Sequence, residues 1–107
     1  MDEREFAERA EQMLAHIEGV LEGVDQGLDY EVAPGGILEI EFDDGSQVII
    51  NRHMAAREIW VAARSGGFHF RWDGADWVDT RSGKSLLPCL EEVLSSQAGV
   101  QIVFPSC

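Results

Sequence analysis

The sequence predicts an α+β fold: a two-layer α-β sandwich with two helices packed on one face of an antiparallel sheet. An apolar stripe at helical spacing lies near the N-terminus, alternating segments follow it, and a second amphipathic segment lies near the C-terminus. Two amphipathic helices need an apolar surface to cover, and an antiparallel sheet with one apolar face supplies it. The chain of 107 residues is long enough for one modest core, so we expect a single domain over residues 1–107.

The first helix is predicted from apolar residues that recur at spacings of three and four. They fill one stripe of a helical wheel, which indicates a helix packed on a core. The stripe consists of Phe6, Ala10, Met13, Leu14, Ile17, Leu21 and Val24. Gly19 and Gly23 interrupt this helix, and a glycine in a helix interior costs about 1 kcal/mol relative to alanine.

The strands are predicted from shorter segments. ILEIEF at 37–42 alternates apolar and acidic residues, as a half-buried strand does. DDG at 43–45 predicts a hairpin turn into the strand SQVIIN. Further strand candidates are EIWVAA, GFHFRW and DWVDT, with Gly66-Gly67 and Asp73-Gly74 as the turns between them.

A second helix is predicted from about Leu86 to Gln97, where the apolar residues again share one face. Ser85 is a suitable N-cap, and Gly99 fits the end of the helix. The segment VQIVF at 100–104 predicts a last strand.

Charge limits the kind of partner. Twenty acidic residues against eight Lys and Arg give a formal net charge of −12. Nucleic acid is disfavoured because a phosphate backbone needs a basic surface, whereas cations and basic protein surfaces are favoured. MDEREF lacks the features of a secretory signal, and no apolar run approaches the roughly 20 residues that span a bilayer. Cys89 and Cys107 are not spaced as a metal or redox pair, so we expect a cytoplasmic protein without a membrane partner.

Acidic residues line one flank of the predicted first helix. Glu11, Glu18, Glu22 and Asp25 fall within about 60° of one another on a helical wheel, and Asp29 and Glu31 continue the charge into the first strand. We refer to these residues as the acidic ridge. It is either a solvated helix face or a shallow site for hard cations, since carboxylate oxygens suit calcium, magnesium, manganese or iron. A convex row of carboxylates cannot surround an ion, so such a site would bind weakly and reversibly.

Other candidate residues carry weaker signals. His16, His53 and His69 are scattered and are predicted to be surface histidines rather than ligands. Trp60 is expected to face outward on the sheet, where it either packs at an edge or anchors a protein interface. Asn51 and Arg52 are its polar neighbours. RSGKS at 81–85 lacks the first glycine of a phosphate-binding loop and is interpreted as a loop into the second helix.

Several segments in order resemble the frataxin family, specifically the bacterial CyaY type, from about Glu5 to Phe104. GGILEIEFDDGSQVIINR is similar to the family's first hairpin and its Asn-Arg signature, and EIWVAARSGGFHF to its tryptophan strand and Gly-Gly-aromatic-His-Phe segment. DWVDTRSGKS is similar to the last hairpin strand with its Arg-Ser-Gly loop, and SSQAG to the end of the second helix.

The resemblance implies a frataxin-like sandwich without an active site and without an organic cofactor. It implies weak binding of ferrous and ferric iron on the acidic ridge, and binding to the cysteine desulfurase and the scaffold protein of iron–sulfur cluster assembly. The ridge positions that match are Glu18, Glu22, Asp25, Asp29 and Glu31; the partner-binding positions are Glu18, Glu22, Asn51, Arg52 and Trp60. Bacterial relatives often carry acidic pairs where this chain has Glu18-Gly19 and Glu22-Gly23, which predicts weaker iron loading.

Three functions follow as hypotheses. The first is an iron-sensing regulator or iron chaperone of iron–sulfur cluster assembly, expected as a monomer, with iron-dependent oligomers left open. The second is ferroxidase and iron storage, which is disfavoured because the chain has no Glu-x-x-His pair of the kind that helical ferroxidases use. The third is an acidic interaction domain that works without metal.

Overall fold

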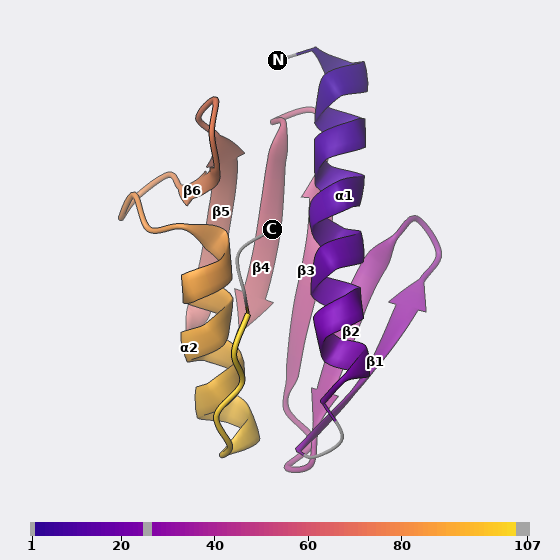
Figure 1. Cartoon of the computed structure of the whole chain (residues 1–107), viewed down its shortest axis with the longest axis vertical. Coiled ribbons are helices and arrows are strands. Elements are labelled where there is room, and N and C mark those ends of the chain that lie inside the picture. The colour runs from indigo at the N-terminus through magenta and orange to yellow at the C-terminus, as the bar shows by residue number, and fades with distance from the viewer. Residues whose placement is uncertain (1, 25–26, 105–107) are drawn as a thin grey trace.

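Two helices cover one face of a six-stranded antiparallel sheet, as the sequence predicted, and the other face of the sheet is open (Figure 1). The computed structural model describes residues 2–24 and 27–104. The strands lie in the sheet in their order along the chain, so that β1 and β6 form its edges. The elements are α1 (Glu3–Glu22), β1 (Leu28–Ala33), β2 (Ile37–Phe42), β3 (Gln47–His53), β4 (Glu58–Ala63), β5 (Gly66–Trp72), β6 (Trp77–Asp79) and α2 (Leu86–Ala98).

Helix α1 begins at a side-chain cap and buries the predicted stripe. The Asp2 carboxylate accepts a hydrogen bond from the Glu5 amide at 2.7 Å, which satisfies one of the free amides of the first turn. Phe6, Ala10 and Ile17 are fully buried against the sheet. Gly23 forms the C-cap, so the helix ends at the second of the two glycines.

The strands alternate as expected, and their buried residues meet the helices. In β2, Leu38, Ile40 and Phe42 are buried, while Glu41 between them is exposed. One turn was assigned wrongly. Gly66-Gly67 lies inside β5, where Gly66 pairs with Ala63, and residues 64–65 make the turn. The register of the β4–β5 hairpin leaves only these two residues between its strands, and the φ of +140° at Gly66 suits a glycine beside the turn.

The prediction of a last strand at 100–104 is wrong. These residues pair with no strand and run as an extended segment beside α2, over the helix-covered side of the sheet (Figure 1). Ile102 and Phe104 are buried, while Val103 is 58% exposed. The Ser95 hydroxyl accepts a hydrogen bond from the Ile102 amide at 2.8 Å, in place of the backbone carbonyl that a neighbouring strand would supply. A short, mostly apolar run suits an unpaired extended segment as well as a strand, so the sequence could not distinguish the two.

Helix α2 has the predicted ends. Ser85 is the N-cap residue, although its side chain makes no capping hydrogen bond, and Gly99 closes the helix at a φ of +73°. Cys89 is buried in the core, as expected for a small apolar position. Cys107 lies outside the described residues.

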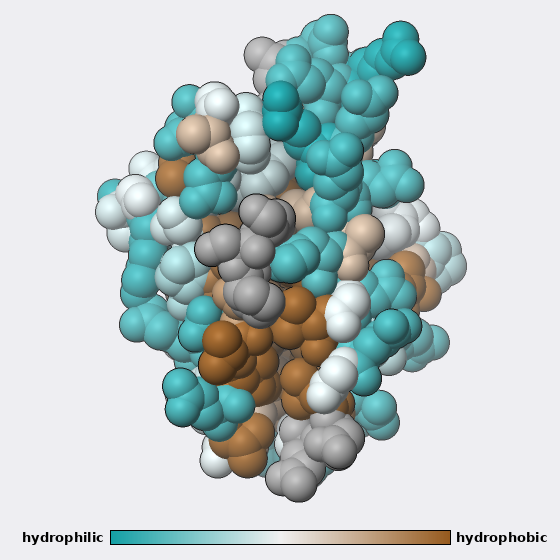
Figure 2. Space-filling model, in the orientation of Figure 1, coloured by the Kyte–Doolittle hydropathy of each residue, from teal (hydrophilic) through white to brown (hydrophobic). Residues whose placement is uncertain are grey.

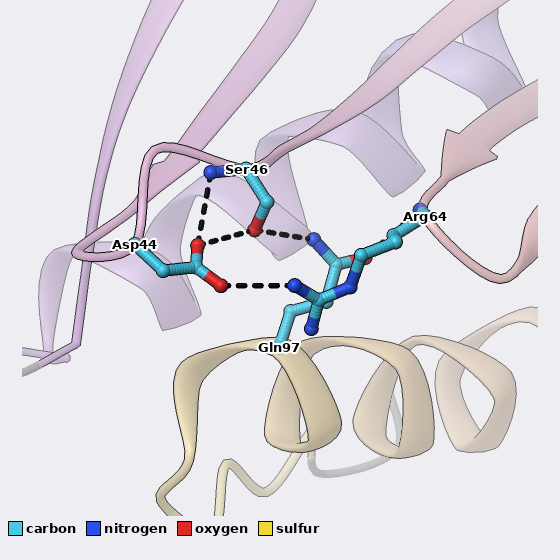
Figure 3. A network of polar contacts seen from close by, with 4 residues as sticks. All are labelled: Asp44, Ser46, Arg64 and Gln97. Carbon is cyan, nitrogen blue, oxygen red and sulfur yellow. Dashed lines mark hydrogen bonds and ion pairs between the residues drawn. The ribbon is translucent and has the colours of Figure 1, made fainter.

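A network of hydrogen bonds links the C-terminal end of α2 to the β2–β3 turn and the β4–β5 turn (Figure 3). The buried Gln97 side chain donates to the Ser46 hydroxyl at 3.0 Å and accepts from the Arg64 amide at 3.2 Å. Asp44 accepts from Ser46 and from the Arg64 guanidinium, which lies 2.9 Å away. These hydrogen bonds lower the pKa of Asp44 to about 2.

Candidate functional site

Helix α1 places its share of the acidic ridge beside the edge strand β1. Glu11 and Glu22 are exposed and Glu18 is half-buried. Glu11 and Glu18 line a groove together with Val32 of β1. Asp25, which was assigned to the same row, lies outside the described residues. The structure therefore describes three ridge carboxylates on the flank of α1 that faces β1.

Tyr30 connects this flank to β1. Its side chain lies on the helix-facing side of the strand, near the Glu22 carboxylate. Desolvation raises the pKa of Tyr30 above its usual 10.0, and the negative charges of Glu22 and Glu18 raise it further. The tyrosine thus remains a neutral donor in the physiological pH range.

Asp29 and Glu31 lie on the opposite face of β1, because they alternate with Leu28 and Tyr30 along the strand. On the open face of the sheet, Asp29 pairs with Glu41 of β2, and Glu31 pairs with Glu39. Like charges directly opposite each other destabilise a strand pair. The acidic surface therefore continues around the edge of the sheet from α1 onto its open face.

Glu39 and Glu41 were not assigned to the ridge from the sequence. Their alternation in ILEIEF already placed them on the face opposite the core. What was missing was the register of the β1–β2 hairpin, which sets them opposite Asp29 and Glu31. The four carboxylates line one shallow depression together with Gln47.

Basic side chains do not neutralise this surface. The ion pairs among residues 2–24 and 27–104 are Arg4–Glu8, Arg9–Glu5, Arg64–Asp44, His69–Glu58, Arg71–Glu58 and Lys84–Glu92. None of them includes Glu11, Glu18, Glu22, Asp29, Glu31, Glu39 or Glu41. None of these carboxylates is held in an ion pair within the described part of the fold, although Arg52 lines the same groove as Glu11 and Glu18.

The carboxylates do not form a ready-made metal cage. Within the described ranges, no group of three or more His, Cys, Asp or Glu side chains is placed to hold a metal ion. An ion at this surface would keep much of its water and contact one or two carboxylates at a time. Hard cations such as magnesium or ferrous iron tolerate such oxygen-only ligation, while zinc and copper prefer nitrogen and sulfur.

The open face also carries the predicted tryptophan, in an arrangement that the sequence did not reveal. Trp60 lies between two imidazole rings, with centroids 4.0 Å from His53 and 4.6 Å from His69. Its indole nitrogen donates to the buried Glu58 carboxylate at 2.8 Å, and Arg71 donates to the same group at 2.8 Å. Burial raises the pKa of Glu58, but these two hydrogen bonds outweigh it and hold the pKa below its usual value. Both faces of the indole are covered and its orientation is fixed.

The two residues predicted as polar neighbours of Trp60, Asn51 and Arg52, lie on opposite sides of the sheet. Asn51 is the direct cross-strand partner of Trp60 and shares the open face. Arg52 is the next residue along β3, so its side chain lies on the other side of the sheet. There its guanidinium donates to the Gly35 carbonyl at 3.0 Å in the β1–β2 turn. The structure brings Asn51 and Trp60 together and does not bring Arg52 to them.

None of the helices described is both long and apolar enough to cross a membrane.

Comparison with known proteins agrees with this architecture. The family model described as a frataxin-like domain matches residues 1–100. The iron-sulfur cluster assembly protein CyaY of Dechloromonas aromatica is 59% identical over 103 residues, covering 96% of this chain and 98% of that protein. The protein of the same name from a Janthinobacterium species is 44% identical, covering 96% of both chains.

Solved structures share the fold. Frataxin from Psychromonas ingrahamii superposes with a TM-score of 0.90 at 28% identity, covering 99% of this chain and 100% of that one. A trimeric frataxin from Saccharomyces cerevisiae, whose structure is described as a complex with ferrous iron, has a TM-score of 0.67 at 24% identity. The match covers 92% of this chain and 88% of the yeast chain. From the family model and the curated relatives together, the chain belongs to the frataxin family, of the bacterial CyaY type.

Proposed function

We propose that this chain is an iron-binding regulator or iron chaperone of iron–sulfur cluster assembly, which binds iron weakly on the acidic ridge and docks on the cysteine desulfurase. The observation that carries the proposal is that none of the described ridge carboxylates, nor Glu39 or Glu41 beside them, takes part in a described ion pair. The CyaY relatives named as iron-sulfur cluster assembly proteins support the cellular role.

The geometry suits transfer better than storage. A surface without a closed ligand cage exchanges its ion readily, which is what delivery to a second protein requires. A ferroxidase centre needs closely spaced carboxylates with histidine, as in the Glu-x-x-His pairs of helical bundles. The sequence has no Glu-x-x-His pair, and the described residues contain no cluster of three or more His, Cys, Asp or Glu side chains placed to hold a metal. We therefore propose no catalytic step for this chain.

The same carboxylates suit a protein partner with a basic surface. Complementary charge accelerates association and orients the two proteins, and the effect weakens as salt increases. Trp60 and Asn51 would extend the contact onto the open sheet face, where the fixed indole needs no reordering upon binding.

Anaerobic titration with ferrous iron, followed by amide NMR, tests the iron site. We expect the signals of α1 and of β1–β2 to shift or broaden first, in fast exchange. If signals elsewhere move while those of α1 and β1 remain in place, the ridge is not the iron site. Oxygen consumption well above the buffer control upon iron addition would instead support a ferroxidase.

Binding to purified cysteine desulfurase tests the docking surface. The variant Glu18→Lys/Glu22→Lys should lose most of the affinity, because it reverses charge at the centre of the α1 flank. Glu91→Lys/Glu92→Lys on α2 changes the net charge by the same amount and serves as the matched control. Equal losses in both variants would mean that only net charge matters. Identical affinity with and without iron at physiological salt would favour an interaction domain that works without metal.

A further inference from the structure

A groove interrupts the acidic ridge between α1 and the β1–β2 hairpin. It has a volume of about 350 Å³, and its apolar floor is made by Leu14, Ala15, Val32 and Leu38. Val32 lies on the edge strand and is 50% exposed, an unusual placement for a valine on the helix-facing side of a sheet. Figure 2 shows a small apolar area to the right of α1, over the end of β1 and β2, within otherwise hydrophilic surface. We refer to this groove as the notch.

Charged side chains border the notch in a fixed arrangement. Glu11 and Glu18 line it from α1, two helical turns apart, and neither takes part in any of the described ion pairs. Arg52 lines the opposite end, where its bond to the Gly35 carbonyl holds the guanidinium in place. Gly36 permits this approach, because a side chain there would begin 2.8 Å from the Arg52 guanidinium.

We propose that the notch receives an aliphatic side chain of a protein partner, flanked by basic side chains that pair with Glu11 and Glu18. The inference rests on the proposed function and adds to it the chemistry of the docking segment. Charge complementarity selects a basic segment, and the apolar floor requires a hydrocarbon anchor between the basic residues. Small buried anchors of this kind often dominate the affinity of an interface.

The features of the notch argue against the other occupants. Glu11 and Glu18 stand two helical turns apart, about 10 Å along the helix axis, with an apolar floor between them, so they are poorly placed to ligate one metal ion together inside the notch. A small-molecule site of this volume would be at the lower limit of known ligand pockets, and those bury most of the ligand surface. A surface groove between one helix and an edge strand instead fits one side chain of a docked segment.

Two isosteric substitutions test the proposal against cysteine desulfurase as the probe. Val32→Thr replaces one methyl group of the notch by a hydroxyl while keeping shape, branching and charge. Val103→Thr makes the same change at an exposed valine of the C-terminal segment and is the matched control. We expect Val32→Thr to weaken binding about three- to tenfold and Val103→Thr to leave it within about twofold. Val32→Ile, which retains the apolar floor, should bind as tightly as the native chain.

Salt dependence separates the notch from the ridge. The loss caused by Val32→Thr should be the same factor at about 0.05 M and about 0.3 M salt, whereas the loss in Glu18→Lys/Glu22→Lys should shrink at the higher salt. If Val32→Thr binds normally while the charge reversal abolishes binding, the notch inference fails and the proposed function stands. If Val32→Ile loses as much as Val32→Thr, a change in the strand is responsible and the inference also fails. If neither Val32→Thr nor the charge reversal weakens binding, both proposals fail.

Discussion

Replacing Gly19 by alanine should stabilise the protein without altering its charge. Gly19 lies in the interior of α1, is exposed, and has a helical backbone. Apart from its chain neighbours and the adjoining helix backbone, a methyl group added there would meet no atom within 4 Å. The substitution therefore forms no contact and breaks none, and its effect reduces to the difference in helix propensity between glycine and alanine. That difference is about 0.8–1.0 kcal/mol.

The expected gain corresponds to a rise in melting temperature of about 4–8 °C for a domain of this size class. Thermal unfolding followed by circular dichroism measures it, with urea unfolding as a second probe. Gly23→Ala is the matched comparison, because Gly23 is the C-cap and an added Cβ would lie 3.5 Å from the Val20 carbonyl. Its gain should be smaller, since a terminal residue contributes less to the helix.

An unchanged or lower melting temperature for Gly19→Ala would refute the reasoning, because nothing in the structure opposes the methyl group. Desulfurase binding and iron titration should remain as in the native chain. If they weaken, then the flexibility of the glycine next to Glu18, and not only its missing charge, contributes to function. Gly19→Glu, which adds a carboxylate beside Glu18, should instead increase iron loading.

Three further predictions concern stability. Gln97→Ala should lower the free energy of unfolding by about 1–3 kcal/mol, because it removes two buried hydrogen bonds, whereas the exposed Gln101→Ala should have almost no effect. Asp44→Asn should lower the melting temperature near neutral pH. The gap in melting temperature between this variant and the native chain should narrow as the pH falls. The folded-state pKa of about 2 lies below the unfolded value of 3.8, so the native chain loses this stabilisation between about pH 4 and pH 2; a constant difference across that range would contradict the assignment. Glu58→Gln should lower the free energy of unfolding by about 1–2 kcal/mol at neutral pH, because it removes the charged hydrogen bond from Arg71. A change below about 0.3 kcal/mol would mean that the stack around Trp60, whose indole also donates to Glu58, does not depend on this carboxylate.

The fold was largely predictable because its signals are local. The apolar stripe of α1 and the alternation of ILEIEF follow from the period of each element, and each period has one structural meaning over that length. The predictions of secondary structure were wrong where one sequence pattern fits two conformations. Residues 100–104 form a short, mostly apolar run, which suits a paired strand and an unpaired extended segment equally.

The candidate site was predictable only in part. Helical spacing alone brought Glu11, Glu18 and Glu22 to one flank, since those positions belong to a single helix. Trp60 on the open face followed from the alternation of its strand. The stack of His53, Trp60 and His69 was not predicted, because it depends on the register of three neighbouring strands.

Composition and local period identify the acidic residues, the members of the α1 flank and the strands that have an apolar face. The packing of the whole chain adds that Asp29 and Glu31 face away from α1 and meet Glu39 and Glu41. It also places Arg52 beside the notch and away from Trp60. These placements depend on the register of neighbouring strands, which the turn between them and the burial of one face set together, and on how a helix packs against a sheet edge. The period of a single element encodes neither.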